Sequence, residues 1–293
     1  MKIDSDLLEA VNEDLRREDV PHARRPFEAI MRVSKKLGIS IAIRSEEADM
    51  IFRWFKEREK PGSGAVGSVY TSAFYFDSEF WAVDIPIAYG TVSIGPFDYI
   101  REMPEATIEL LANSKGAHYL VFWADCADYG MGFDELRRNK HLSSFGVELL
   151  NAADQELRNT VSLLLESRPK SRAILTARMA TELFLKSFLA LRGELSQMDA
   201  KAIGHDLKAG FERLIEVSGL SNWQPIVERL KVFPPISGRY REQVVSNSSL
   251  AEALAIAQSL GATTTREFTN RRIIEQIMPQ VEPYLGELGQ SGL

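Results

Sequence analysis

The stretch ARMATELFLKSFLALRG, residues 177–193, decides the fold of the second half of this chain. Most of its residues are apolar, so a helix formed from it must be buried on most of its sides. Arg178, Glu182 and Lys186 nevertheless recur at intervals of four residues, which places them along one stripe of that helix. The sequence therefore predicts a helix inside a bundle that carries an internal row of charges.

The rest of the second half is predicted to be helical as well. Apolar residues there recur with helical periodicity, and glycines or prolines such as Gly219 and Gly261 separate the segments. The predicted helices are 146–167, 172–192, 200–217, 222–232, 248–261 and 264–288.

The first half mixes helical and strand-like patterns. Aromatic and β-branched runs predict consecutive strands, and the nearly continuous apolar run AHYLVFWADC predicts a buried central strand. We expect helices at 4–18, 25–37, 45–57 and 104–113, and strands at 39–43, 69–76, 79–90, 91–95 and 117–126. The fold class is therefore α+β, with an N-terminal α/β domain (1–144) that holds a mostly antiparallel or mixed sheet, followed by an all-helical bundle (145–293).

Length and composition limit the classes of protein. A chain of 293 residues is long for one domain, so we expect two. The net charge is −6 and the acidic excess lies in the first half, so neither half is a basic nucleic-acid platform. The single cysteine, Cys126, excludes an internal disulfide. With no signal-peptide pattern and no apolar run near the roughly 18 residues of a membrane span, we expect a cytoplasmic protein.

No motif for a cofactor or a metal stands out. GSGAVGSV, residues 62–69, matches a glycine-rich phosphate loop in letters, but a helix precedes it and strands follow, so we interpret it as a surface loop. The histidines lack zinc-site spacing. Carboxylates in or after the predicted strands could hold Mg²⁺, although capping or solvated carboxylates are the simpler interpretation. They are Asp77, Glu79, Asp84, Asp125 and Asp128.

Two further motifs follow the charged helix. GHDL, residues 204–207, opens the next predicted helix, and FPPISGRYRE, residues 233–242, comes later. An apolar helix with an internal E-x-x-x-K, followed by HDL and then RYR, resembles a HEPN domain over residues 146–277. This resemblance implies a helical bundle that pairs as a homodimer, and either a nucleotide-binding role or metal-independent RNase activity.

The sequence departs from the RNase branch of that family. In that branch an arginine is followed, after four to six residues, by a histidine that acts as acid or base. His205 is the last histidine of the chain, and the nearest arginine before it, Arg192, is too far away. We therefore expect metal-free RNase activity to be weak or absent.

The leading hypothesis is a binding or interaction protein with a regulatory N-terminal domain. Its helical domain would bind nucleotide or RNA, and a second subunit would cover the excess apolar surface of the 172–192 helix. The candidate ligand-binding residues are Glu182, Lys186, His205, Asp206, Arg239 and Arg241. They could instead be helix caps and structural ion pairs.

Two alternatives from other classes of protein stay open at this point. One is an atypical RNA-cleaving toxin or defence effector. The other is an enzyme with an acidic site in the first domain, around Asp84 and Asp125.

Overall fold

In the computed structural model the chain forms two compact units, Met1–Ser68 and Val69–Leu293. The described residues are 3–20, 24–42, 45–58, 68–87, 94–219 and 223–288. Within them the chain is mostly helical, with one small two-stranded antiparallel sheet. None of the described helices is long and apolar enough to cross a membrane.

The first unit consists of three short helices around an apolar core. They are α1 (Ser5–Arg17), α2 (Arg25–Leu37) and α3 (Glu46–Lys56), as the sequence predicted. Two of these helices begin at a capping side chain: Asp4 accepts a hydrogen bond from the first turn of α1, and Ser45 from that of α3. α2 ends at Gly38, which adopts the left-handed conformation.

The strand predicted at 39–43 is wrong for the part that is described. Residues 39–42 are in neither helix nor strand. This short apolar run pairs with no described strand, and a lone strand leaves its backbone hydrogen-bonding groups unpaired.

The second unit begins with a β-hairpin. β1 (Ser68–Phe76) pairs with β2 (Glu79–Pro86), as predicted, and the turn residues Asp77 and Ser78 have positive φ angles of 50° and 67°, as a tight hairpin turn requires. A single antiparallel bridge joins Val83 to Ile100. Of the strands expected beyond residue 86, residues 88–93 lie outside the described part, and residues 87, 94 and 95 are not in a strand.

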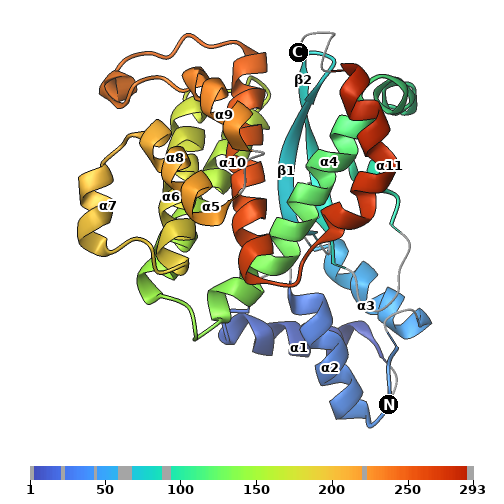
Figure 1. Cartoon of the computed structure of the whole chain (residues 1–293). Helices are drawn as coiled ribbons and strands as arrows, with labels where there is room; N and C mark the ends of the chain where they lie inside the picture. The colour runs from blue at the N-terminus through green and yellow to red at the C-terminus, as the bar shows by residue number, and fades with distance from the viewer. Residues whose placement is uncertain are drawn as a thin grey trace. The chain divides into compact units, whose positions relative to one another are not determined.

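The predicted central strand at 117–126 is wrong, because this run lies in the middle of α4 (Glu105–Arg138). A short 3-10 helix, η2 (Pro96–Tyr99), precedes α4. After a kink at Lys115, α4 packs against the hairpin, α10 and α11, so the apolar run at 117–126 is covered on several sides (Figure 1). A helix surrounded in this way has the same continuous apolar pattern as a buried strand.

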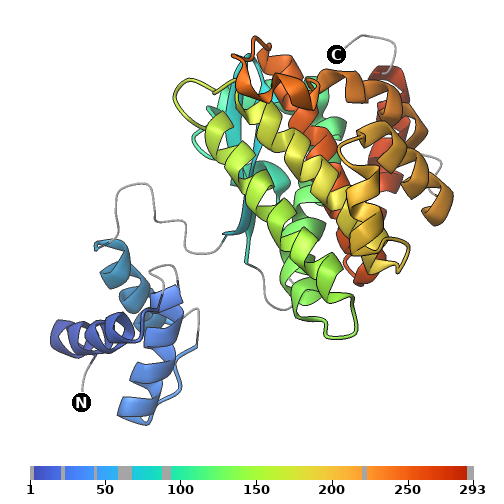
Figure 2. The same ribbon diagram turned by 90° about the vertical axis from the view of Figure 1, so that its left-hand side faces the viewer.

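The remaining helices form the bundle. α5 (Ser144–Leu164) and α6 (Ala173–Leu191) lie side by side (Figure 2). α10 lies between α6 and α4 (Figure 1). The other elements are α7 (Gln197–Ile203), α8 (Leu207–Ser218), α9 (Gln224–Arg229), η4 (Leu230–Val232), η5 (Ile236–Tyr240), α10 (Asn247–Phe268) and α11 (Ile273–Leu288).

Gly261 does not end a helix, contrary to the prediction. It lies inside α10, and a Cβ atom there would be 3.0 Å from the ring of Phe184. The glycine allows α10 and α6 to approach closely, which is a packing role and not a helix stop.

The predicted domain boundary between residues 144 and 145 does not coincide with the division at Ser68 and Val69. The physical reason is that the hairpin and α4 complete the core of the helical unit. The Tyr70 hydroxyl on β1 donates to Gln258 Oε1 on α10 at 2.6 Å, and both residues are buried.

α6 is covered by its own chain. α5, α8 and α10 pack around it, and none of its residues is fully exposed. The sequence predicted that a second subunit covers excess apolar surface on this helix. In the structure, helices of the same chain cover that surface.

Candidate functional site

The charged stripe of α6 forms an ion cluster inside the second unit. Glu182 lies at its centre, with Lys186 Nζ 2.8 Å from one carboxylate oxygen and Arg178 Nη1 3.5 Å from the other. The Glu182 and Arg178 side chains are only 6% and 8% exposed. Burial lowers the pKa of Arg178, and the neighbouring carboxylate of Glu182 opposes this effect.

The same two cations hold the loop between α7 and α8. Lys186 Nζ donates to the carbonyl oxygen of Gly204 at 2.6 Å, and Arg178 Nη2 donates to that of His205 at 2.8 Å. Gly204 has φ +60°, a conformation that favours glycine. Asp206 then caps α8 by accepting from the backbone N–H of Ala209 at 3.1 Å. The loop is therefore fixed at each of its three residues.

The imidazole of His205 is attached to the cluster by one nitrogen. Its Nδ1 lies 3.0 Å from both carboxylate oxygens of Glu182. The side chain is 49% exposed, in contrast to its buried partner. Glu182 thus orients a ring that remains accessible to solvent.

His205 also lines an open pocket with a volume of about 340 Å³. Small-molecule sites typically occupy about 300–1,000 Å³, so this pocket can hold one small ligand or one end of a larger ligand. Its lining residues are Arg178, His205, Asp206, Leu207, Lys208, Val227, Glu228, Leu230, Lys231, Phe233, Pro234 and Pro235.

The residues that line the pocket form two groups that differ in chemistry. One group comprises Arg178 of α6, His205 and Asp206 of the loop, and Lys208 at the start of α8. The helix dipole favours an anion at this end of α8, and the carboxylate of Asp206 already accepts from the backbone N–H of Ala209 there. The second group, from α9 to the start of η5, is largely apolar and includes Phe233 and Pro234, with Glu228 and Lys231 as its charged residues. Such a pocket suits a ligand that has an anionic end and an apolar, flat body.

The structure places the predicted site residues as follows. It brings Glu182, Lys186 and His205 together, and uses Asp206 as a helix cap. Arg241 is exposed directly after η5 and makes no described contact with this cluster. The side chain of Arg239 lies outside the described part.

Sequence reasoning missed the pocket walls. Lys208, Lys231 and Phe233 meet only because α8, α9 and η4 fold around the same loop. FPPISG belongs to one of the motifs in the sequence, but nothing in its residue types indicates that Phe233, Pro234 and Pro235 line the same pocket as His205.

The acidic residues of the alternative site are occupied in ion pairs. Asp84 receives two hydrogen bonds at 2.8 Å from Arg101 Nη2 and one at 2.6 Å from Thr71. Asp125 and Asp128 pair instead with Arg266 of α10. The structure thus gives Asp84 and Asp125 separate arginine partners.

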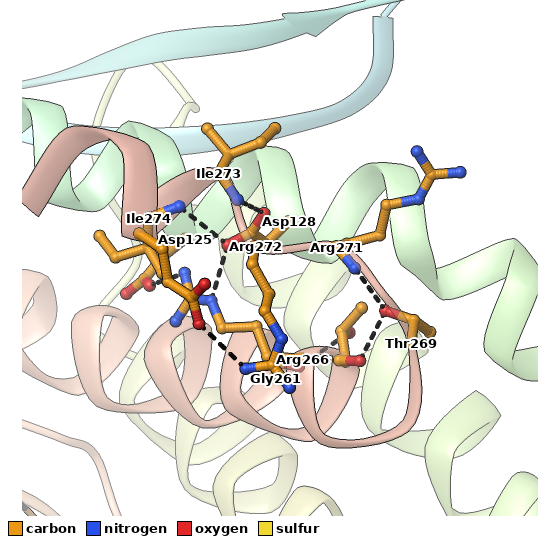
Figure 3. A network of polar contacts seen from close by, with 11 residues as sticks. Asp125, Asp128, Gly261, Arg266, Thr269, Arg271, Arg272, Ile273 and Ile274 are labelled. Atoms are coloured by element: carbon orange, nitrogen blue, oxygen red, sulfur yellow. Dashed lines mark hydrogen bonds and ion pairs between the residues drawn. The ribbon is translucent and has the colours of Figure 1, made fainter.

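Figure 3 shows the second of these pairings as a network. Arg266 donates at 2.6 Å to Asp125 Oδ1 through Nη2 and to Asp128 Oδ2 through Nε. The carboxylate of Asp128 also accepts from the backbone N–H groups of Ile273 and Ile274, so a residue of α4 caps α11. Burial raises the pKa of Asp125, against the opposing charge of Arg266. This network joins α4, α10 and α11, which is a structural role.

Metal and thiol chemistry find no support in the described residues. No group of three or more histidine, cysteine or acidic side chains within them could hold a metal ion. Cys126 is fully buried, and this burial raises the pKa of its thiol, which leaves it a poor nucleophile.

Comparisons with known proteins do not assign the chain to a class. No family model matches it, and neither the curated proteins nor the solved structures gave a significant match.

Proposed function

We propose that this chain is a binding protein whose HEPN-like helical unit holds a nucleotide in the pocket beside His205. One observation supports this more than any other. The buried charges of α6 fix the loop of Gly204, His205 and Asp206 at the edge of a pocket that is lined by both cationic and apolar side chains. A phosphate suits the cations Lys208 and Lys231, and a base suits the apolar residues.

The buried charges themselves favour a functional role. Enclosing Arg178, Glu182 and Lys186 carries a desolvation cost that well-packed apolar residues would avoid. Here the enclosed groups orient an exposed imidazole and two backbone carbonyls. Precise positioning of a ligand-binding loop gives a reason for that cost.

Binding is tested by isothermal titration calorimetry of the full chain with nucleoside 5′-monophosphates, with the free nucleosides for comparison. We expect the monophosphates to bind and the nucleosides to bind far more weakly. Replacing both Lys208 and Lys231 by alanine should weaken binding about tenfold or more, because a hydrogen bond to a charged group contributes roughly 1.5–3 kcal/mol.

A matched control is Lys140→Ala, which removes an exposed cation outside the pocket. It should leave the affinity unchanged. Equal effects of the pocket and control variants, or no binding of any monophosphate, would reject this function.

The proposal also includes a homodimer and a regulatory unit. The homodimer follows from the family resemblance alone, since α6 is covered within its own chain. The sequence predicted a regulatory domain over residues 1–144. We now assign the regulatory role to the unit Met1–Ser68, which has its own apolar core.

One observation favours RNA cleavage as a second candidate function. The fold places Arg178 beside His205, although the two residues lack the sequence spacing of the RNase branch. The guanidinium donates to the backbone carbonyl, however, and its Nη1 is buried. We expect single-stranded RNA to stay intact in EDTA. Cleavage that His205→Ala abolishes would promote this second candidate.

A further inference from the structure

Two helices of the bundle begin at the same end of the second unit. Phe184 of α6 lies against Gly261 of α10, and Arg192 at the end of α6 pairs with Glu267 near the end of α10. The two helices are therefore parallel, and their first turns lie at one end of the bundle. The segments that lead into them lie at this end as well, at the upper edge of the bundle in Figure 2.

We propose that single-stranded nucleic acid binds across this end of the bundle, over a surface formed by residues 165–172 and 236–246. We call this surface the cationic end. None of its residues lines the pocket of the proposed function, so the two sites are separate and either can exist without the other. The bases stack on an exposed aromatic ring, and the phosphates contact exposed cations.

Positive charge gathers at the cationic end of an acidic chain. The net charge of the chain is −6, yet the first segment of this surface holds three cations and one carboxylate, and the second holds two arginines and one glutamate. Arg168, Arg172 and Arg241 are exposed and form no ion pair with another residue that the structure describes. Lys170 pairs with Glu166 at 3.2 Å, and both side chains are about half exposed. The positive ends of the dipoles of α6 and α10 add to the same potential.

Tyr240 provides a ring on which a base can stack. It ends η5 and is 84% exposed. The turn around it is held by Gln243, whose Nε2 donates at 2.8 Å to the carbonyl oxygens of Gly238 and Arg241. A ring on a fixed turn loses little conformational freedom when it binds a ligand. Aromatic rings for the bases, together with cations for the backbone, are what proteins use to bind single strands without reading their sequence.

The opposite end of α5 offers a comparison within the same unit. Residues 137–140 also carry three cations, and they precede α5, whereas residues 165–172 follow it. Arg137 and Arg138 both pair with Asp134, however, and this stretch contains no aromatic residue. We therefore expect a single strand to bind at the cationic end and not at residues 137–140.

Fluorescence anisotropy of the full chain with labelled oligonucleotides tests the proposal. The probes are oligouridylate and oligothymidylate of about 12 nucleotides, because single-strand sites span about 4–16 nucleotides. EDTA is present throughout. We expect binding at low salt, and the ratio of the two affinities shows whether the 2′-hydroxyl contributes. An abasic strand of the same length retains the phosphates but has nothing to stack, and should bind at least fivefold more weakly.

A loop variant, in which Arg168, Lys170 and Arg172 are all replaced by alanine, should bind at least tenfold more weakly at low salt. Its plot of log affinity against log salt concentration should be shallower by roughly 2, because each phosphate contact on a single strand contributes about 0.7 to that slope. The matched control replaces the three cations of residues 137–140 by alanine. It changes the net charge equally at the other end of α5, and should leave both quantities nearly unchanged.

Tyr240→Ala should weaken binding about fivefold or more, whereas Tyr240→Phe, which keeps the ring, should bind like the wild type. All the replaced side chains are exposed, so the variants should keep their fold, which circular dichroism checks. The proposal is overturned if neither strand binds, if the abasic strand binds equally well, if the loop and control variants lose affinity equally, or if Tyr240→Ala keeps full affinity. None of these results bears on the pocket, whose occupancy is measured separately by calorimetry with nucleoside monophosphates.

Discussion

His205 and Glu182, which are 23 residues apart in the chain, are joined by contacts of 3.0 Å from one ring nitrogen to both carboxylate oxygens. The contact links the innermost helix of the bundle to the loop that opens α8. It combines a buried acid with a half-exposed base. The stability of the bundle and the geometry of the pocket therefore depend on the same side chain, Glu182.

Glu182→Ala should destabilise the second unit strongly. It leaves Arg178 and Lys186 enclosed without their shared carboxylate, and removing one partner of a buried ion pair costs roughly 3–5 kcal/mol. The free energy of unfolding from urea titration measures the loss. Glu182→Gln, which retains an acceptor for Lys186, should lose less.

Glu166→Ala is the matched control for this prediction. Glu166 pairs with Lys170 at 3.2 Å, but both side chains are about half exposed, and exposed pairs contribute little. Similar losses in the Glu166 and Glu182 variants would show that the central cluster is not enclosed as described.

The sequence predicted the cluster but not the pocket. The spacing of Arg178, Glu182 and Lys186 places them on one stripe of a helix, and the position of His205 followed from a motif resemblance. Contacts within a helix are local and can be derived from spacing. The wall formed by Phe233 and Lys231 depends on long-range packing, which spacing does not encode.

The same distinction explains the error at residues 117–126. Apolar periodicity identifies a helix only when one face is polar, and α4 is surrounded by the hairpin, α10 and α11. Because the apolar pattern of this segment predicts a strand, the apparent change from strands to helices lies near residue 144. The contact of Tyr70 with Gln258 shows that the hairpin belongs with the later helices.

Fragments can test where the chain divides. Residues 69–293 should fold alone with one cooperative unfolding transition, because they contain the complete second unit. Residues 145–293 should not, because they lack α4, which packs on both α10 and α11. Circular dichroism during thermal unfolding distinguishes these outcomes. A cooperative transition in the shorter fragment would restore the boundary that the sequence predicted.

Asp128→Ala should loosen α11 and destabilise the second unit. Asp128 is fully buried, accepts two backbone hydrogen bonds at the start of α11, and pairs with Arg266. We expect a loss of roughly 3–5 kcal/mol in the free energy of unfolding. Relative to the wild type, amide hydrogen exchange should accelerate more in α11 than in α5.

Asp134→Ala provides the control on the same helix. Asp134 is 57% exposed and pairs with exposed arginines of its own helix, so its loss should change neither quantity appreciably. Unchanged exchange of α11 in Asp128→Ala would mean that this carboxylate does not hold the helix.

Gly130→Ala tests the packing of the hairpin on α4. A Cβ atom at Gly130 would lie 2.6 Å from Tyr70 Cβ. Two carbon atoms that are not bonded to each other cannot approach so closely, so β1 or α4 would have to shift. Such overpacking costs about 1–3 kcal/mol, which outweighs the gain of up to about 1 kcal/mol from replacing glycine in a helix.

Gly116→Ala, on the same helix, meets no atom closer than 3.9 Å and should be neutral or slightly stabilising. Urea denaturation of both variants gives the comparison. If Gly130→Ala were as stable as Gly116→Ala, then β1 would not lie directly against α4, and the assignment of the hairpin to the helical unit would lose its closest contact.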